Sequence, residues 1–178
     1  MHKVFTQVSR TKQGEITPEV KAVAADESLP VETIMEGLLE GTVVIPANIK
    51  HKNLHPRGIG NKLRTKVNAN IGSSGAFPDA ENERIKLQAA LEAGADAVMD
   101  LSTGDDLREI RSMVLGLSPV PVGTVPIHEA AVKARFSSGA VLKMTEDDLF
   151  LVIEEHAAEG VDFLTLHCDR CGQGCPQG

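Results

Sequence analysis

Residues 65–71, TKVNANI, and residues 161–167, VDFLTLH, enclose a region in which short apolar runs alternate with amphipathic segments. Two similar runs lie between them, ADAVMDLS at residues 95–102 and VPVGTV at residues 120–125. Such runs, rich in β-branched residues, are typical of buried strands. Their alternation with helical segments predicts repeated βα units, and therefore an α/β fold with a parallel sheet and right-handed crossovers.

Helix signals occupy the segments between these runs. Residues 79–93 carry apolar side chains on one face, and residues 105–117 form a second helical segment whose first two aspartates are expected to cap it. Weaker signals follow Pro126. The pair Thr145 and Asp148 resembles a capping box, which predicts a further helix that runs to about Glu159.

The first sixty residues differ from the rest and predict an N-terminal appendage of two short helices and an extended segment. Thr17 is the expected N-cap of the first helix, with Pro18 in its first turn. Gly41 is expected to end the second helix. VVIPANI, residues 43–49, then predicts a buried strand or extended run. We therefore divide the chain into an appendage (1–60), a βα region (61–167) and an irregular tail (168–178).

Polar residues stand at the carboxyl ends of the predicted strands, where a (β/α)8 barrel builds its active site. A complete barrel needs about 250 residues, so four strands amount to the first half of one. The doubly wound alternative needs a phosphate-binding fingerprint, and IGSSG is not a G-x-G-x-x-G sequence. The strand-end residues are Asn68, Asn70, Asp100, Ser102, Thr103, Thr124, His128 and His167.

Composition limits the possible partners. The formal charge of −7 argues against an extended, positively charged surface of the kind that binds nucleic acid. We therefore expect no nucleic-acid partner. The N-terminal sequence lacks the apolar core of a signal peptide, and no stretch approaches the roughly 18 apolar residues of a membrane span. We therefore expect a cytoplasmic protein with no membrane contact.

Five ordered segments resemble the phosphomethylpyrimidine synthase family over about residues 5–167. They are VIPANIKH, KVNANIGSS, GADAVMDLSTG, PVGTVPIHEA and GVDFLTLH. They occur in the family's order and at similar spacing, and motifs such as NANIG are unusual, so the match is highly specific. The similarity covers the N-terminal portion of the family's sequence pattern.

The resemblance implies a (β/α)8 barrel enzyme, a carbon–carbon lyase of thiamine biosynthesis. It would convert 5-aminoimidazole ribotide into 4-amino-5-hydroxymethyl-2-methylpyrimidine phosphate, using a [4Fe-4S] cluster, S-adenosylmethionine and zinc. Related hydroxybenzimidazole synthases of cobamide biosynthesis share the motifs and the substrate, so they remain an alternative. A non-catalytic ribotide-binding fragment is another alternative.

The resemblance also carries over four substrate-binding positions: Asn70, Met99, His128 and His167. The family usually has a tyrosine after VPI, where this chain has His128. Histidine lacks the reach of a phenol and titrates near neutral pH, which puts ribotide affinity in doubt. From the residues alone, Asn70 is equally compatible with strand-end hydrogen bonding, and Met99 with core packing. We assign no catalytic residue.

Cys168, Cys171 and Cys175 all lie in the tail, at C-x2-C-x3-C spacing. They could hold part of an iron–sulfur or zinc site, but the family's cluster motif is C-x2-C-x4-C and lies further downstream. The family's metal-binding histidines and Ser-Arg-Gly motif are also missing. We expect a truncated or frameshifted synthase that is inactive by itself, and we assign no metal ligand.

Two further expectations concern association and polar side chains. Half a barrel leaves strand edges unpaired, so we expect a homo-oligomer or a poorly folded chain. His51 and His55 could form a phosphate or metal patch, but spaced histidines in a polar loop are usually solvated. Glu154 and Glu155, beside His156, are expected to form a helix surface with a salt-bridged or exposed face.

Overall fold

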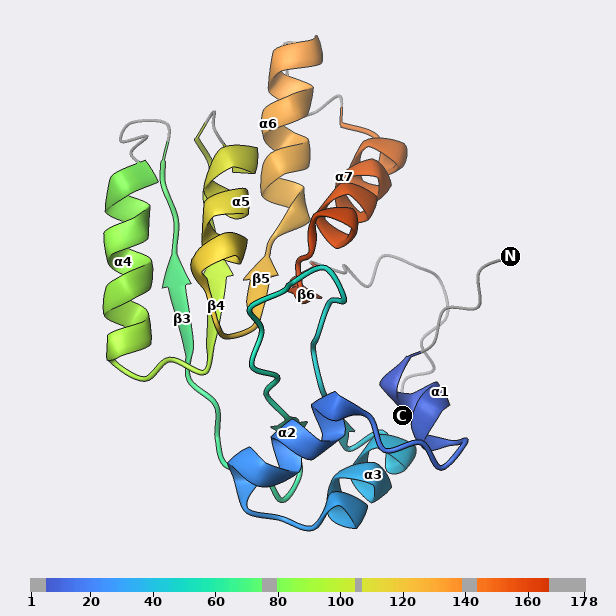
Figure 1. Cartoon of the computed structure of the whole chain (residues 1–178). Helices are drawn as coiled ribbons and strands as arrows, with labels where there is room; N and C mark the ends of the chain where they lie inside the picture. Colours follow the sequence, from blue (N-terminus) through green and yellow to red (C-terminus); the bar gives the residue numbers. More distant parts are fainter. Residues whose placement is uncertain (1–5, 75–79, 105–106, 139–143, 167–178) are drawn as a thin grey trace, which may run out of the picture.

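A four-stranded parallel sheet organises the larger part of the molecule in the computed structural model, which describes residues 6–74, 80–104, 107–138 and 144–166 (Figure 1). The strand order is β3-β4-β5-β6. The elements of the described residues are α1 (Gln7–Thr11), α2 (Pro18–Glu27), α3 (Val31–Glu40), β1 (Val43–Val44), β2 (Ile59–Gly60), β3 (Asn68–Ile71), α4 (Ala80–Glu92), β4 (Ala97–Asp100), α5 (Leu107–Leu117), β5 (Val122–Thr124), α6 (Pro126–Ser138), α7 (Glu146–Glu159) and β6 (Phe163–Leu164).

The predicted α/β fold with four parallel strands is confirmed. The helix predicted from the capping box is α7, since Thr145 Oγ1 accepts the Asp148 N–H at 3.2 Å and the Asp148 carboxylate accepts the Thr145 N–H at 2.8 Å. The described strands form an open sheet, so closure into a barrel stays a prediction. The aspartates predicted to cap α5, together with His167 and the cysteine tail, lie outside the described residues.

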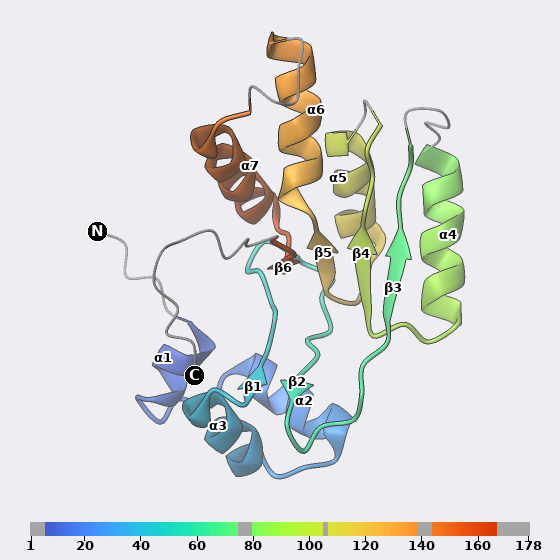
Figure 2. The same ribbon diagram turned by 180° about the vertical axis from the view of Figure 1, so that it is seen from behind.

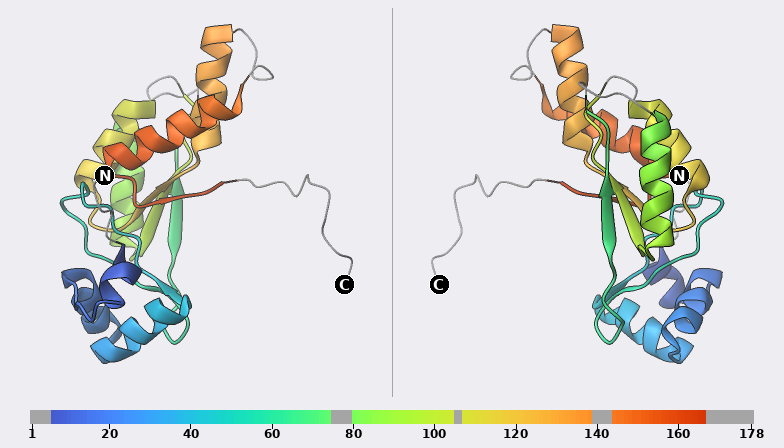
Figure 3. Two further views of the ribbon diagram at one scale, coloured as in Figure 1. Left: turned by 90° about the vertical axis from the view of Figure 1, so that its right-hand side faces the viewer. Right: turned by 90° about the vertical axis from the view of Figure 1, so that its left-hand side faces the viewer.

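The sheet has one covered and one uncovered face. The helices that connect the strands gather on one side, and the opposite side carries no layer of described residues (Figure 3). Side chains alternate accordingly along β3, where Asn68 and Asn70 are exposed and Ile71 is only 6% exposed. The covered face packs an apolar core made of Ile71, Leu87, Val98, Ile110, Val114, Leu115, Val120, Val122 and Val161.

The N-terminal segment contains three helices, so the prediction of two was one short. Its α2 begins as predicted, with Thr17 Oγ1 accepting the Val20 N–H at 3.2 Å and Pro18 in the first turn. The helices α2 and α3 enclose a second apolar cluster built around Val20, Val23, Ile34 and Leu38. Of the predicted strand in residues 43–49, only β1 forms, paired antiparallel with β2 (Figure 2).

Two polar contacts fasten the N-terminal segment to the sheet. Asp96, just before β4, accepts hydrogen bonds from Arg64 Nη2 at 2.6 Å and from the Val67 N–H at 2.9 Å, while Arg64 also pairs with Asp26 of α2. The second contact joins His51 to Asp162, which precedes β6, at 2.6 Å. The segment is therefore held next to β4 and next to β6.

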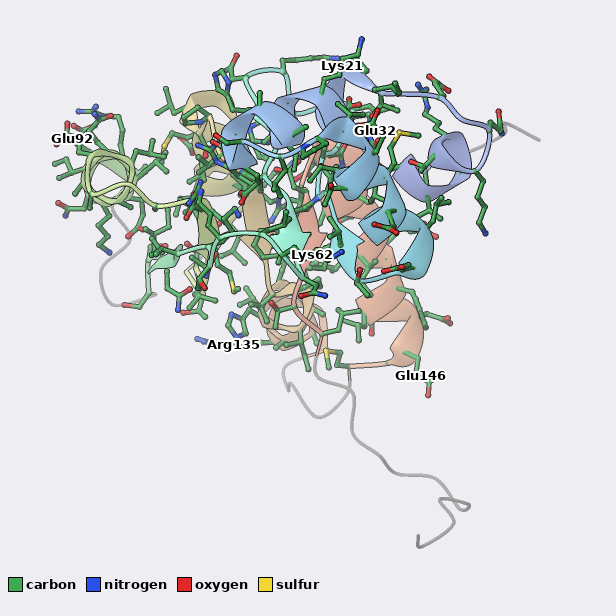
Figure 4. All side chains as sticks on the ribbon, turned by 90° about the horizontal axis from the view of Figure 1, so that it is seen from below. Lys21, Glu32, Lys62, Glu92, Arg135 and Glu146 are labelled. Atoms are coloured by element: carbon green, nitrogen blue, oxygen red, sulfur yellow. The ribbon has the colours of Figure 1, made fainter. Side chains whose placement is uncertain are left out.

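The outer surface of the described helices is charged. Lys21, Glu32, Glu92 and Glu146 are all exposed, and Lys21 and Glu146 project from the rim of the view in Figure 4. None of the helices in the described ranges combines the length and the apolar character that a membrane span needs.

Candidate functional site

Two of the predicted substrate-binding residues are strand partners on the uncovered face. Asn70 of β3 is in register with Met99 of β4, and Met99 is in register with Gly123 of β5. The side-chain N–H of Asn68 donates to Asn70 Oδ1 at 3.0 Å. This hydrogen bond orients the exposed amide group of Asn70. Thr165 donates to Met99 Sδ at 3.7 Å.

Phe163 extends this row across the sheet. It is in register with Gly123, and a Cβ added to Gly123 would lie 2.2 Å from the Phe163 ring. Glycine at this position lets the aromatic ring lie over β5. Asn70, Met99, Gly123 and Phe163 therefore form one continuous strip, which we call the sheet row. It presents an amide, a thioether and a half-buried ring on the same face.

The loops that follow β3 and β4 are bound closely to each other. Gly72 has φ +153°, and a Cβ there would lie 2.7 Å from the carbonyl carbon of Leu101. The Ser73 N–H donates to Ser102 Oγ at 3.0 Å, and the Gly72 N–H donates to the buried Glu83 carboxylate at 2.8 Å. These contacts fix the strand ends beside Asn70.

His128 lies in the first turn of α6, directly after β5, and is half-buried. It belongs to a different group of contacts from the sheet row. Its backbone N–H donates to the Val125 carbonyl at 3.0 Å, whereas its ring Nδ1 is buried without a hydrogen-bond partner among the described residues. His167, the fourth predicted site residue, lies outside the described residues.

A buried ionic network lies next to His128, on the covered side of the sheet. Arg111 of α5 donates to Glu129 of α6 at 2.6 Å and to Glu159 of α7 at 2.6 Å. His156 Nε2 lies 2.8 Å from the same Glu129 oxygen, and His156 Nδ1 lies 2.8 Å from the Thr124 hydroxyl. The network therefore ties three helices to the end of β5.

The charges of this network are mutually stabilised. Burial disfavours ionisation of Glu129, but the hydrogen bond from His156 and the charge of Arg111 outweigh it and hold the pKa of Glu129 far below its ordinary value. Burial also opposes the charge on Arg111, yet Glu159 and Glu129 raise the pKa of Arg111. The Glu129 carboxylate accepts from His156 Nε2, so His156 Nδ1 is free to accept from Thr124.

Asp100, at the end of β4, differs from these paired groups. Burial raises the pKa of the Asp100 carboxyl, although hydrogen bonds from Ser102 oppose that shift. The Ser102 N–H donates to Asp100 Oδ1 at 2.9 Å. A carboxyl with a raised pKa at the carboxyl end of a parallel strand is a site candidate on physical grounds.

The sequence interpretation missed this network. The helix surface at Glu154 and Glu155, beside His156, was expected to be salt-bridged or exposed. Glu155 does pair with Lys133, whereas His156 pairs with Glu129 in the interior and is only 2% exposed. A signal did exist: Arg111 and His156 both fall on the apolar stripe of their helices, where a polar residue must find a buried partner. His51 was expected to be solvated, and that is wrong, because its side chain is fully buried.

The residues in ranges 6–74, 80–104, 107–138 and 144–166 contain no group of three or more His, Cys, Asp or Glu side chains that could hold a metal ion. Cys168, Cys171 and Cys175 fall outside these ranges. The described side chains therefore do not fit an iron–sulfur cluster or a zinc ion.

Fold and site together define a class: an α/β protein with a parallel four-stranded sheet that carries polar side chains at its strand ends. The comparison with family models makes this specific. Residues 6–173 match the model of the Radical SAM ThiC family, and the chain belongs to that family.

Curated relatives agree with this assignment. The chain is 56% identical over 163 residues to the phosphomethylpyrimidine synthase of Desulforudis audaxviator and 53% identical over 164 residues to that of a Thermoanaerobacter species. It is 52% identical over 163 residues to phosphomethylpyrimidine synthase 2 of Methanothermobacter thermautotrophicus. Each match covers 92% of this chain but 38% of the relative, so the chain spans well under half the length of these proteins.

Proposed function

We propose that this chain forms one side of the ribotide site of a phosphomethylpyrimidine synthase. In the complete protein, that site converts 5-aminoimidazole ribotide into 4-amino-5-hydroxymethyl-2-methylpyrimidine phosphate. Asn70, Met99, His128 and His167 contact the substrate in this proposal. The observation that carries it is the pairing of Asn70 with Met99 on an uncovered sheet face in a chain of this family.

The chemistry of the sheet row suits a planar heterocycle with polar edges. The Asn70 amide offers a donor and an acceptor, while the Met99 thioether and the Phe163 ring offer soft apolar surface. An amide next to an apolar strip can bind the edge of an imidazole ring and pack against its face. Polar groups set in a mostly apolar surface are the usual pattern of a small-molecule site.

The family's radical chemistry comes from a [4Fe-4S] cluster and S-adenosylmethionine, which together generate a deoxyadenosyl radical, and zinc is expected by the same resemblance. The described residues provide no ligand set for these groups. We therefore assign to this part of the chain the binding and orientation of the ribotide, and no step of the radical reaction.

The test is calorimetric titration of 5-aminoimidazole ribotide into the chain and into Asn70→Ala. Loss of one amide hydrogen bond costs about 1.4 kcal/mol, so the dissociation constant should rise about tenfold. Asn61→Ala, an exposed amide in the N-terminal segment, serves as the matched control and should bind like the parent chain. Equal affinity of the parent chain and Asn70→Ala would reject the assignment of Asn70.

Product analysis separates the remaining alternatives. The thiamine and cobamide branches share the ribotide, so only the product formed by a complete, reconstituted enzyme distinguishes them. Ribotide binding without any turnover by the 178-residue chain supports a binding fragment, whereas turnover by that chain would exclude it.

A further inference from the structure

A small polar cavity lies behind the strand ends, between the sheet and α5, α6 and α7. Its volume is about 10 Å³, close to the roughly 10–15 Å³ that one water molecule needs. The residues around it are mostly polar. They are Asp100, Ser102, Leu107, Arg111, Thr124, Val125, His128, Glu129 and His156.

Two of the lining residues carry buried nitrogen atoms without a partner in the described part of the chain. One is Nη2 of Arg111, a residue that is 3% exposed, and the other is Nδ1 of His128. The other Arg111 nitrogens, Nε and Nη1, already donate to Glu159 and Glu129. An unpaired buried donor costs roughly 1–3 kcal/mol, so a partner for Nη2 would be strongly favoured.

We infer that one water molecule bound in this cavity links Arg111 and Asp100 to His128 and thereby positions the His128 ring. The water accepts from Arg111 Nη2 and donates to His128 Nδ1 and to the Asp100 carboxylate. It thus has three polar partners, the usual number for a buried water. Arg111 and Asp100 act through this water as positioning residues.

The direction of the hydrogen bonds fixes the protonation of the ring. The water oxygen is occupied by the Arg111 donor, and its two hydrogens are directed to the Asp100 carboxylate and to His128 Nδ1, so Nδ1 is the acceptor. A neutral ring that accepts at Nδ1 carries its proton on Nε2. His128 can then donate a hydrogen bond from Nε2 to the ribotide. This role rests on the proposed ribotide site.

The test uses the ¹⁵N-histidine-labelled chain without ligand, at about pH 8, where an ordinary histidine is neutral. Long-range ¹H–¹⁵N correlation reports which ring nitrogen carries the proton, and His128→Gln identifies the His128 signals by their loss. We expect the Nε2–H tautomer for His128. Because no ribotide is present, this result does not depend on whether the chain binds ribotide.

The water is tested by Ser102→Thr, which keeps the hydroxyl that accepts from Ser73 and adds a methyl group at the cavity. We expect His128 to become a mixture of tautomers, and its contact with a long-lived water in nuclear Overhauser spectra to disappear. Ser112→Thr is the matched control. It adds the same methyl group at an exposed position of α5 and should leave both signals unchanged.

Several outcomes decide the inference. An Nδ1–H tautomer in the parent chain, or the absence of a water contact at His128, overturns it even if Ser102→Thr fails to fold. A pure Nε2–H tautomer in folded Ser102→Thr also overturns it, because the ring would then be set without the water.

Discussion

Asp162 accepts three hydrogen bonds from parts of the chain that are far apart in sequence. The Asn48 N–H donates to Oδ1 at 2.8 Å, and the Val122 N–H donates to Oδ2 at 2.8 Å. His51 Nδ1 also lies 2.6 Å from Oδ2, while His51 Nε2 lies 2.9 Å from the Ser118 carbonyl. Both ring nitrogens face acceptors, so the His51 ring satisfies both partners only in its protonated form, in which both nitrogens donate.

This ion pair predicts a stability that depends on pH. Burial disfavours the charged ring, but Asp162 and the Ser118 carbonyl outweigh it and raise the pKa of His51 above 6.5. The folded state thus binds the proton more tightly than the unfolded state does. The stabilisation is complete below about pH 6.5 and is lost as the pH rises through the raised folded pKa.

We therefore expect the free energy of unfolding of the parent chain, measured with urea, to fall as the pH rises above about 6.5. His51→Gln should be less stable by about 3 kcal/mol near pH 6 and should lose most of this slope. His55→Gln replaces an exposed histidine four residues later and is the control. An unchanged slope in His51→Gln would contradict the prediction.

The contrast between His51 and His55 shows what the sequence could not provide at this scale. Both residues stand in the same polar, basic loop, and no local pattern separates them. His51 is buried because it pairs with Asp162, which lies 111 positions later in the sequence. Asn70 and Met99 could be proposed from the family motifs, whereas the pairing of Arg111 with Glu129 and Glu159 depends on how three helices pack.

At the scale of elements, the local signals were informative wherever chemistry within a few residues decides the structure. The caps at Thr17 and Thr145 and the left-handed helix end at Gly41, with φ +71°, all occur where the sequence predicts them. One local signal was missed, because α1 begins at a cap in which Thr6 Oγ1 accepts the Ser9 N–H. The short extent of β1 depends instead on packing against α2 and α3. Such contacts are not visible in a window of ten residues.

Gly72 allows a sharp test of how β3 and β4 are joined. Gly72→Ala meets both an unfavourable φ of +153° and backbone atoms of Leu101 and Ser102 at 2.7–2.8 Å. Gly94→Ala is the matched control, since φ is +85° there but nothing lies within 4 Å of the added Cβ. We expect urea unfolding to show a loss of about 1 kcal/mol for Gly94→Ala.

For Gly72→Ala the expected loss is roughly 3 kcal/mol or more, because backbone overlap adds to the strain and backbone atoms cannot rotate away. Ribotide affinity should fall as well, since the strand end next to Asn70 must shift. Equal losses for the two variants would show that the contact with Leu101 and Ser102 is not needed.

At the scale of the whole molecule, the arrangement leaves β3 and β6 as outer strands of the described sheet, with one sheet face uncovered. The Val67 and Ile71 carbonyls accept from Ala97 and Leu101 of the β4 side, at 3.2 and 2.8 Å. In a parallel ladder alternate residues point their N–H and C=O groups to opposite neighbours. Asn68 therefore directs its backbone groups to the free edge of β3.

A free, regular strand edge is a template for pairing with another chain, so we expect the 178-residue chain to self-associate. Asn68→Pro removes a donor from the free edge without removing a bond to β4. Light scattering after size exclusion should show that association of Asn68→Pro needs about tenfold more protein, an effect of about 1.4 kcal/mol. Ala69→Pro, which removes a bond on the β4 side, should instead lower the unfolding midpoint. A parent chain that stays monomeric at every concentration would show that the β3 edge is protected in solution.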